Sequence, residues 1–267
     1  MCEKMLKKTP EIAEICGAFI GDGWIESRKT SLYITGDITE DRPYYNEHLA
    51  KLFSKNICKI QPRELPYWSV YGLAFYKRKL IGELLELGFI PGKKNNRVRI
   101  PKWIINSKDK KILCSVLRGV FDTDGSFFCK KDYGKWRKEY RKLHHCQPRI
   151  SIKVASKYLI KDIIILADKL GLEYTNPNPR KSKRSNELKT YIFEINSLRS
   201  IKNWFEKVVK PANEKHKTKY EIWKKFGFVP PFTSLDERKK ILAGKINPYK
   251  YYAEVPKWSN GIGSRPK

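Results

Sequence analysis

A pattern of eleven residues occurs twice in this chain of 267 residues, and it restricts the possible folds more than any other feature. The first copy, ICGAFIGDGWI, spans residues 15–25, and the second, LRGVFDTDGSF, spans residues 117–127. Similarity at a fixed separation indicates an internal duplication. We therefore expect two half-domains of similar length.

The same order of secondary structure is predicted in both halves. Each copy begins as an amphipathic helix and ends at Asp-Gly, where a glycine is typical of a helix C-terminus. Alternating polar and apolar residues then predict half-buried strands. A second helix, further strands and a last helix follow. The predicted segments are strands at 31–35 and 149–154, helices at 44–54 and 158–170, and strands near 68–75 and 191–195.

These elements predict an α+β fold of two pseudo-symmetric αββαββα half-domains. The expected boundaries are residues 1–104 for the first half, 105–228 for the second, and 229–267 for a C-terminal extension. Residues 101–104, Pro-Lys-Trp-Ile, and the polar stretch 106–111 are interpreted as the linker between the halves.

Glycines at equivalent places in the two motif helices predict that these helices pack against each other. Glycine inside a helix costs about 1 kcal/mol relative to alanine, so Gly17 and Gly119 need a reason such as close backbone approach. Such packing would bring Asp22 and Asp124 together at the helix C-termini. Two adjacent carboxylates repel each other unless cations neutralise them. Mg²⁺, which prefers oxygen ligands, suits such a site.

The formal net charge of +28 predicts a polyanionic partner. Because 40% of the residues are apolar, the charge is expected on a folded surface, which favours nucleic acid. A membrane is disfavoured because no apolar run approaches the roughly 18 residues of a spanning helix. The N-terminal residues lack the apolar region of a signal peptide, so we expect an intracellular protein, in a prokaryotic cytoplasm or nucleoid or in an organelle.

The six cysteines contain no CxxC pair, which argues against a zinc ribbon and a disulfide framework. Most are interpreted as reduced core residues. A metal site at residues 144–146, His-His-Cys, is disfavoured because the sequence places no further ligands beside them.

The two motifs resemble those of the LAGLIDADG homing endonucleases. The second copy, LRGVFDTDG, fits the family pattern closely, and the first, ICGAFIGDG, keeps the glycines and the Asp-Gly pair. The resemblance implies a monomer in which two antiparallel sheets form a saddle over double-stranded DNA. It also implies a metal-dependent cut of both strands at a long site, leaving short 3′ overhangs. The metal is expected to be Mg²⁺, with Mn²⁺ and Ca²⁺ as further occupants.

The resemblance also assigns roles around the motifs. Asp22 and Asp124 bind the metals, together with the main-chain carbonyls of Gly21 and Thr123. A basic residue lies near each scissile phosphate: Lys94 in the first half, and Lys217 in the second, with Lys215 and Lys219 as alternatives. The residue after each hairpin orders water, here near Gly36-Asp37 and on Ser156. Asp122 is interpreted as a structural residue at a helix end.

Base contacts are expected from the polar faces of the strands, although any one of these residues could simply face solvent. The basic run at 180–189 is a candidate phosphate contact. The strand candidates are Glu26, Arg28, Thr30, Ser31, Tyr33 and Thr35, followed by Ser126, Phe128, Lys130, Arg149, Ser151 and Lys153.

Two other functions remain open. One is an intron RNA maturase of the same family, and the other is a DNA-binding regulator without catalysis. Retention of both acids argues against the regulator. An intein is disfavoured because the chain ends lack the residues that protein splicing uses.

Overall fold

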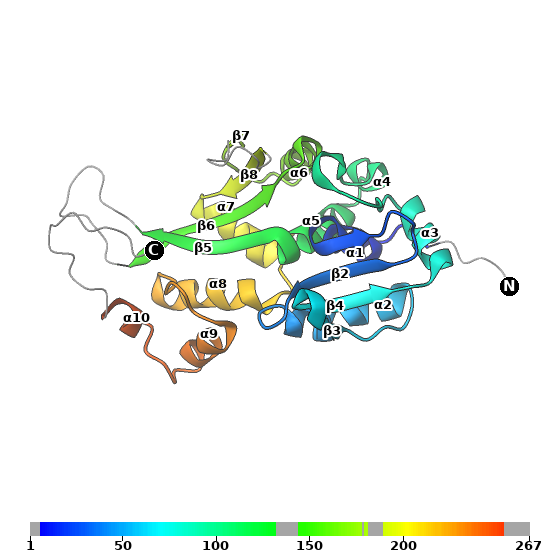
Figure 1. Cartoon of the computed structure of the whole chain (residues 1–267). Coiled ribbons are helices and arrows are strands. Elements are labelled where there is room, and N and C mark those ends of the chain that lie inside the picture. Colours follow the sequence, from blue (N-terminus) through cyan, green and yellow to red (C-terminus); the bar gives the residue numbers. More distant parts are fainter. Residues whose placement is uncertain (1–5, 132–143, 178, 181–188, 254–267) are drawn as a thin grey trace.

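The computed structural model describes residues 6–131, 144–177, 179–180 and 189–253 (Figure 1). Most of the basic run at 180–189 and the last residues of the C-terminal extension lie outside these ranges. The described chain forms two four-stranded antiparallel sheets with helices around them, which confirms the predicted α+β class.

The first half follows the predicted order αββαββα, and its sheet has the strand order β1-β2-β4-β3. A π-helical turn at Tyr44–Leu49 runs directly into the second helix. The elements are α1 (Pro10–Asp22), β1 (Gly23–Ile25), β2 (Leu32–Asp37), α2 (Ala50–Asn56), β3 (Arg63–Leu65), β4 (Val70–Phe75) and α3 (Arg78–Glu86).

The second half repeats this order, with the strands arranged β5-β6-β8-β7. Its elements are α5 (Lys110–Asp124), β5 (Gly125–Lys131), β6 (His145–Val154), α6 (Lys157–Lys169), β7 (Pro179–Arg180), β8 (Thr190–Ile195) and α7 (Leu198–Asn203). A short helix, α4 (Lys102–Ile105), occupies part of the expected linker. Helix α8 (Glu214–Phe226) ends the residues assigned to the second half, and helices α9 (Leu235–Leu242) and α10 (Lys250–Ala253) belong to the C-terminal extension.

Polar residues fix where the longer helices begin. The Thr9 hydroxyl accepts a hydrogen bond from the Ile12 amide, and Pro10 occupies the first turn of α1, where its missing N–H costs nothing. Asp109 caps α5 and Asn213 caps α8 in the same way. A capping side chain stabilises a helix by about 1 kcal/mol. These caps set the start of each helix and hence which residues lie at its end.

Helices α1 and α5 pack side by side at the centre of the molecule, between the two sheets (Figure 1). Glycine makes this approach possible. A Cβ atom on Gly17 would lie 2.2 Å from the Val116 carbonyl oxygen, and one on Gly119 would lie 2.2 Å from the Glu14 carbonyl oxygen. The prediction of close helix packing at these glycines is confirmed.

Each motif helix ends at its Asp-Gly pair, as the sequence predicts. Gly23 and Gly125 both have a φ of −82°, so neither needs the left-handed conformation that glycine favours. Instead, a Cβ on Gly23 would lie 2.1 Å from the Phe19 ring, and one on Gly125 would lie 2.2 Å from the Phe121 ring. Glycine lets the chain turn from helix into strand directly over a buried aromatic residue.

Candidate active site

Asp22 and Asp124 are the last residues of the two central helices. A Cβ on Gly21 would lie 3.3 Å from the carboxyl carbon of Asp124, which shows how closely the second acid approaches the end of α1. Burial and the charge of Asp124 raise the pKa of Asp22 to about 7. Burial of the carboxyl group also raises the pKa of Asp124, while the charges of Lys94 and Lys215 oppose this shift. The acids therefore form an electrostatically strained pair that favours a cation.

Lys94 lies against the end of α1. Its ammonium donates to the carbonyl oxygens of Phe19, Ile20 and Gly21 at 3.0, 2.8 and 2.5 Å. These carbonyls carry the partial negative charge of the helix C-terminus. Burial lowers the pKa of Lys94 to about 8, while Asp124 and Asp22 oppose this shift. The structure thus places Lys94 beside both acids and on the Gly21 carbonyl.

A third carboxylate, Asp41, belongs to the same cluster, and the sequence does not single it out. It is buried and raises the pKa of Asp22, while its Oδ1 lies 2.8 Å from the Lys215 ammonium. Tyr45, in the π-helical turn, donates to Asp22 Oδ2 at 3.2 Å. The one signal for Asp41 is a polar run before a helix start, and this run does not distinguish Asp41 from its neighbours.

Among the three candidate lysines of the second half, the structure brings Lys215 to the acids. The charge of Lys215 opposes the rise in the pKa of both Asp22 and Asp124. Lys217, which the sequence favours, is exposed and pairs with Glu214 at 3.1 Å. Burial and the charge of Arg238 lower the pKa of Lys219 to about 8, while the charge of Glu40 opposes this shift.

The two positions expected to order water have other partners. Asp37 Oδ1 accepts from the amides of Thr39 and Glu40 and from the Thr39 hydroxyl, so it fixes a turn, and these bonds lower its pKa. Ser156 is buried and caps α6, while its hydroxyl donates to the Val98 carbonyl oxygen at 2.7 Å. These protein groups already use the hydrogen bonds of the Ser156 hydroxyl, which conflicts with a role in ordering water.

Asp122 is a structural residue, as interpreted from the sequence. It is buried, and its carboxylate accepts from the amides of Ala212 and Asn213 at 2.8 and 3.2 Å. The Asn213 side chain donates to Asp41 Oδ1 at 2.7 Å and to the Asp122 carbonyl oxygen at 3.0 Å. Burial raises the pKa of Asp122 to about 7. This network ties the first-half acid Asp41 to the start of α8.

The donor set suits a hard divalent cation. Asp22 and Asp124 supply carboxylate oxygens, and the helix ends supply main-chain carbonyls. Within the described residues there is no group of three or more His, Cys, Asp or Glu side chains arranged to hold a metal ion. Carbonyl oxygens of Gly21 and Thr123, water and a bound phosphate would therefore have to complete the coordination. The Thr123 hydroxyl is already bonded to Gly119 and Val120 carbonyls.

The outer face of the first sheet carries aromatic side chains. Trp24 stacks on Tyr33 with ring centroids 5.6 Å apart, and Trp68 meets Tyr33 edge-on at 5.3 Å. Trp24 is 42% exposed and Trp68 51% exposed. Of the other first-half strand candidates, Arg28 is exposed and Thr35 half-buried, whereas Glu26 bonds Thr30 and Ser31 within the hairpin. Ser31 is buried, so it is unsuited to base contact.

The equivalent face of the second sheet carries mostly polar and charged candidate residues, together with the aromatic Phe128. Register makes the two faces comparable, because Gly23 pairs with Ile34 as Gly125 pairs with Ile152. Lys130 and Arg149 both lie beside Glu194, at 3.3 and 3.4 Å. The remaining candidates on this face, half-buried or exposed, are Ser126, Phe128, Ser151 and Lys153. The two sheets thus present different chemistry to any shared ligand.

The described residues include most of the cysteines and His144. None of the five cysteines there forms a disulfide, and Cys16 and Cys129 are buried. His144 stacks on Phe228 at 4.7 Å. The described helices include none with the length and apolar character needed to cross a membrane.

Comparison with known proteins identifies the fold. Residues 111–208 match the model of the LAGLIDADG-like domain. Variants of the homing endonuclease I-DmoI share the fold with a TM-score of 0.51 and 16% identity, over 77% of this chain and 92% of that chain. The meganuclease I-SmaMI bound to uncleavable DNA gives a TM-score of 0.53 at 12% identity, over 93% and 97%. No curated protein matches the sequence.

These matches confirm the resemblance to LAGLIDADG homing endonucleases that the two motifs indicate. The family model covers the second motif, and the structural likeness extends over both halves. The chain therefore has the LAGLIDADG fold, with two half-domains related by the packing of α1 on α5.

Proposed function

We propose that this protein is a homing endonuclease that makes a double-strand cut in a long DNA site and leaves short 3′ overhangs. The observation that carries the proposal is the convergence of Asp22 and Asp124 at the ends of two glycine-packed helices. Each strand of a duplex needs its own hydrolysis, and one acid from each half provides for two cuts. Because both halves are in one chain, the protein acts as a monomer.

The acids act by holding divalent metal, with Mg²⁺ as the physiological ion and Mn²⁺ or Ca²⁺ as alternatives. When bound, the metal supplies a polarised water and charge neutralisation at the phosphate. Asp22 and Asp124 hold it, with the Gly21 and Thr123 carbonyls as further ligands. Tyr45 orients Asp22 by donating to its Oδ2. Both acids have raised pKa values, which is expected for carboxylates arranged to share cations.

Lys94 and Lys215 are the basic residues proposed to act at the scissile phosphates. Lys94 carries its charge at the end of α1, and Lys215 carries its charge beside Asp41. Each can stabilise negative charge that develops on a phosphate during cleavage. We assign the second-half role to Lys215 rather than to Lys217, because the ammonium of Lys217 pairs with Glu214.

Double-stranded DNA is the proposed partner, in keeping with the net charge of +28 and with the DNA-bound structure of I-SmaMI. The outer faces of the two sheets provide the contacts to bases. Release of counterions should make the affinity for duplex DNA fall steeply as salt rises, and a flat double-logarithmic plot would contradict the proposal.

The decisive test uses a plasmid that carries the uninterrupted insertion site of the host gene. Incubation with Mg²⁺ should linearise it, whereas Asp22→Asn and Asp124→Asn should each retain binding and lose cleavage by about a hundredfold or more. Asp236→Asn, at an exposed position on α9, is the matched control. Linearisation by either motif variant at the wild-type rate would refute the assignment. Tight binding to intron RNA without any DNA cleavage would instead favour a maturase.

A further inference from the structure

The C-terminal extension returns to the first half-domain. Helix α9 begins with a capping box, in which Ser234 and Glu237 bond each other's main-chain and side-chain groups, and it packs against α8. At its N-terminus, the Leu235 amide donates to Glu40 Oε1 at 2.7 Å. Glu40 lies in the turn after β2, so a residue of the extension contacts the opposite half of the molecule.

Arg238, in the first turns of α9, is the centre of this contact. Its side chain is only 2% exposed. Nε donates to the Thr218 hydroxyl at 3.1 Å, Nη1 donates to the Thr233 carbonyl oxygen, and Nη2 pairs with Glu40 Oε2. A buried guanidinium is stable only when such partners surround it. Arg238 therefore fixes α8, through Thr218, relative to the first-half turn, through Glu40.

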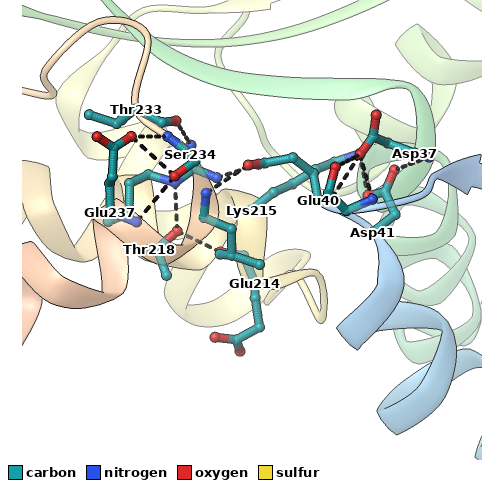
Figure 2. A network of polar contacts seen from close by, with 12 residues as sticks. Asp37, Glu40, Asp41, Glu214, Lys215, Thr218, Thr233, Ser234 and Glu237 are labelled. Atoms are coloured by element: carbon teal, nitrogen blue, oxygen red, sulfur yellow. Dashed lines mark hydrogen bonds and ion pairs between the residues drawn. The ribbon is translucent and has the colours of Figure 1, made fainter.

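Arg238 joins helix α8 to the turn at residues 37–41, and these two segments also provide Lys215 and Asp41, which form an ion pair. Figure 2 shows the network running from Thr233 and Ser234 past Thr218 and Lys215 to Glu40, Asp41 and Asp37. Lys215 precedes Thr218 by one helical turn on α8. Asp41 follows Glu40 directly, and its Oδ2 accepts from the Asp37 amide at 3.0 Å. Movement of α8 against the turn would therefore separate Lys215 from Asp41.

We propose that Arg238 is a positioning residue that clamps α8 to the turn at residues 37–41 and so holds Asp41 and Lys215 beside Asp22 and Asp124. The catalytic consequence rests on the proposed endonuclease function, whereas the clamp itself does not. The C-terminal extension is then a functional part of the active site, contributed from outside both half-domains.

The clamp can be tested without catalysis by amide hydrogen exchange of the free protein. Arg238→Gln removes the positive charge and some of the N–H donors of the guanidinium. Amide exchange in residues 37–41, which lie in the first half-domain, should therefore accelerate by about tenfold or more. Lys239→Ala, on the exposed face of the same helix, is the control and should leave that exchange unchanged. Unchanged exchange in the Arg238→Gln protein would overturn the clamp.

The catalytic consequence is tested by single-turnover cleavage at saturating DNA, well below the melting temperature of each variant. A small displacement of an active-site group can cost about a hundredfold in rate, so Arg238→Gln should lower the rate about 10- to 100-fold. The dissociation constant for DNA should change less than about threefold, because the outer faces of the sheets are untouched. Arg238→Lys, which keeps a charge for Glu40, should recover part of the rate.

The outcomes separate the two proposals. Accelerated exchange with a wild-type cleavage rate would overturn the positioning role. A loss of DNA affinity equal to the loss of rate would indicate a general structural defect and would also overturn it. If the wild-type protein cuts no DNA, the proposed function fails, and the exchange measurement alone decides whether Arg238 holds the turn.

Discussion

Replacing Asp22, one of the two acids proposed to bind metal, should make this protein more stable. Asp22→Asn removes a carboxylate whose pKa is raised to about 7 by burial and by Asp124, and keeps an acceptor for the Tyr45 hydroxyl. The raised pKa means that the folded protein binds this proton more tightly than the unfolded chain does. Stability from this group is therefore present at pH values below about 4 and is lost as pH rises through about 7. Asparagine does not ionise, so the Asp22→Asn protein does not lose this stability as pH rises.

The magnitude follows from the shift. A change from 3.8 to about 7, at about 1.4 kcal/mol per unit, sets an upper limit of about 4 kcal/mol. Asp22 is partly exposed, and solvent screening reduces this limit, so we expect a gain of about 1 to 2 kcal/mol at pH 8.5. For a protein of this size the melting temperature should rise by about 2 to 8 °C.

The assay is thermal unfolding of both proteins between pH 4.5 and 9, with chelator and then with Mg²⁺. The difference in melting temperature should grow up to about pH 7 and then stay constant. Mg²⁺ should narrow it, because binding to the folded wild type adds stability that the variant largely lacks. Asp236→Asn is again the control and should show no such growth. An Asp22→Asn protein that is no more stable than the wild type at pH 8.5 in chelator would refute the reasoning.

Two further variants test other parts of the site. Gly119→Ala should destabilise the fold by about 1 to 3 kcal/mol in urea unfolding, because its Cβ would meet the Glu14 carbonyl oxygen at 2.2 Å. Gly82→Ala is the control, with open space around it in α3, and should be neutral or stabilising. Equal effects of the two substitutions on stability would contradict the role of close helix packing. The cleavage rate should fall as pH rises through about 8, where the buried Lys94 loses its proton, and Lys94→Arg, if active, should shift that fall to higher pH. An identical pH profile for Lys94→Arg would show that Lys94 does not set the profile.

The backbone plan of this protein is predictable from the sequence because it depends on local periodicity and on a repeat. The alternation Ile150, Ile152, Val154 predicts β6, and all three side chains are buried. The paired glycines likewise predict the contact between α1 and α5, since glycine destabilises a helix unless close packing requires it. The first signal lies in neighbouring residues, and the second lies at the same position in two copies of one motif.

The side-chain cluster is harder to predict because it depends on helix phase and on distant contacts. Lys215 and Lys217 are two residues apart on α8, so their side chains are about 200° apart around the helix axis. If the orientation of the helix is predicted wrongly, Lys217, which is exposed and pairs with Glu214, is chosen in place of Lys215, which pairs with Asp41. Asp41 and Arg238 gain their roles only through partners on other elements. Ser156 has the sequence position of a strand-end residue, but it caps α6, which begins at the next residue.

The pairing of Glu40 with Arg238 joins residues 198 positions apart and therefore affects how the protein matures. Chains are synthesised from the N-terminus at about 5–20 residues per second, so Glu40 emerges on the order of 10–40 s before its partner exists. Contacts between such distant segments form late because the loop between them must close first. During translation the first half-domain is left with an unneutralised carboxylate beside its acids. The newly made chain can therefore form the contact between Glu40 and Arg238 only after helix α9 has been synthesised.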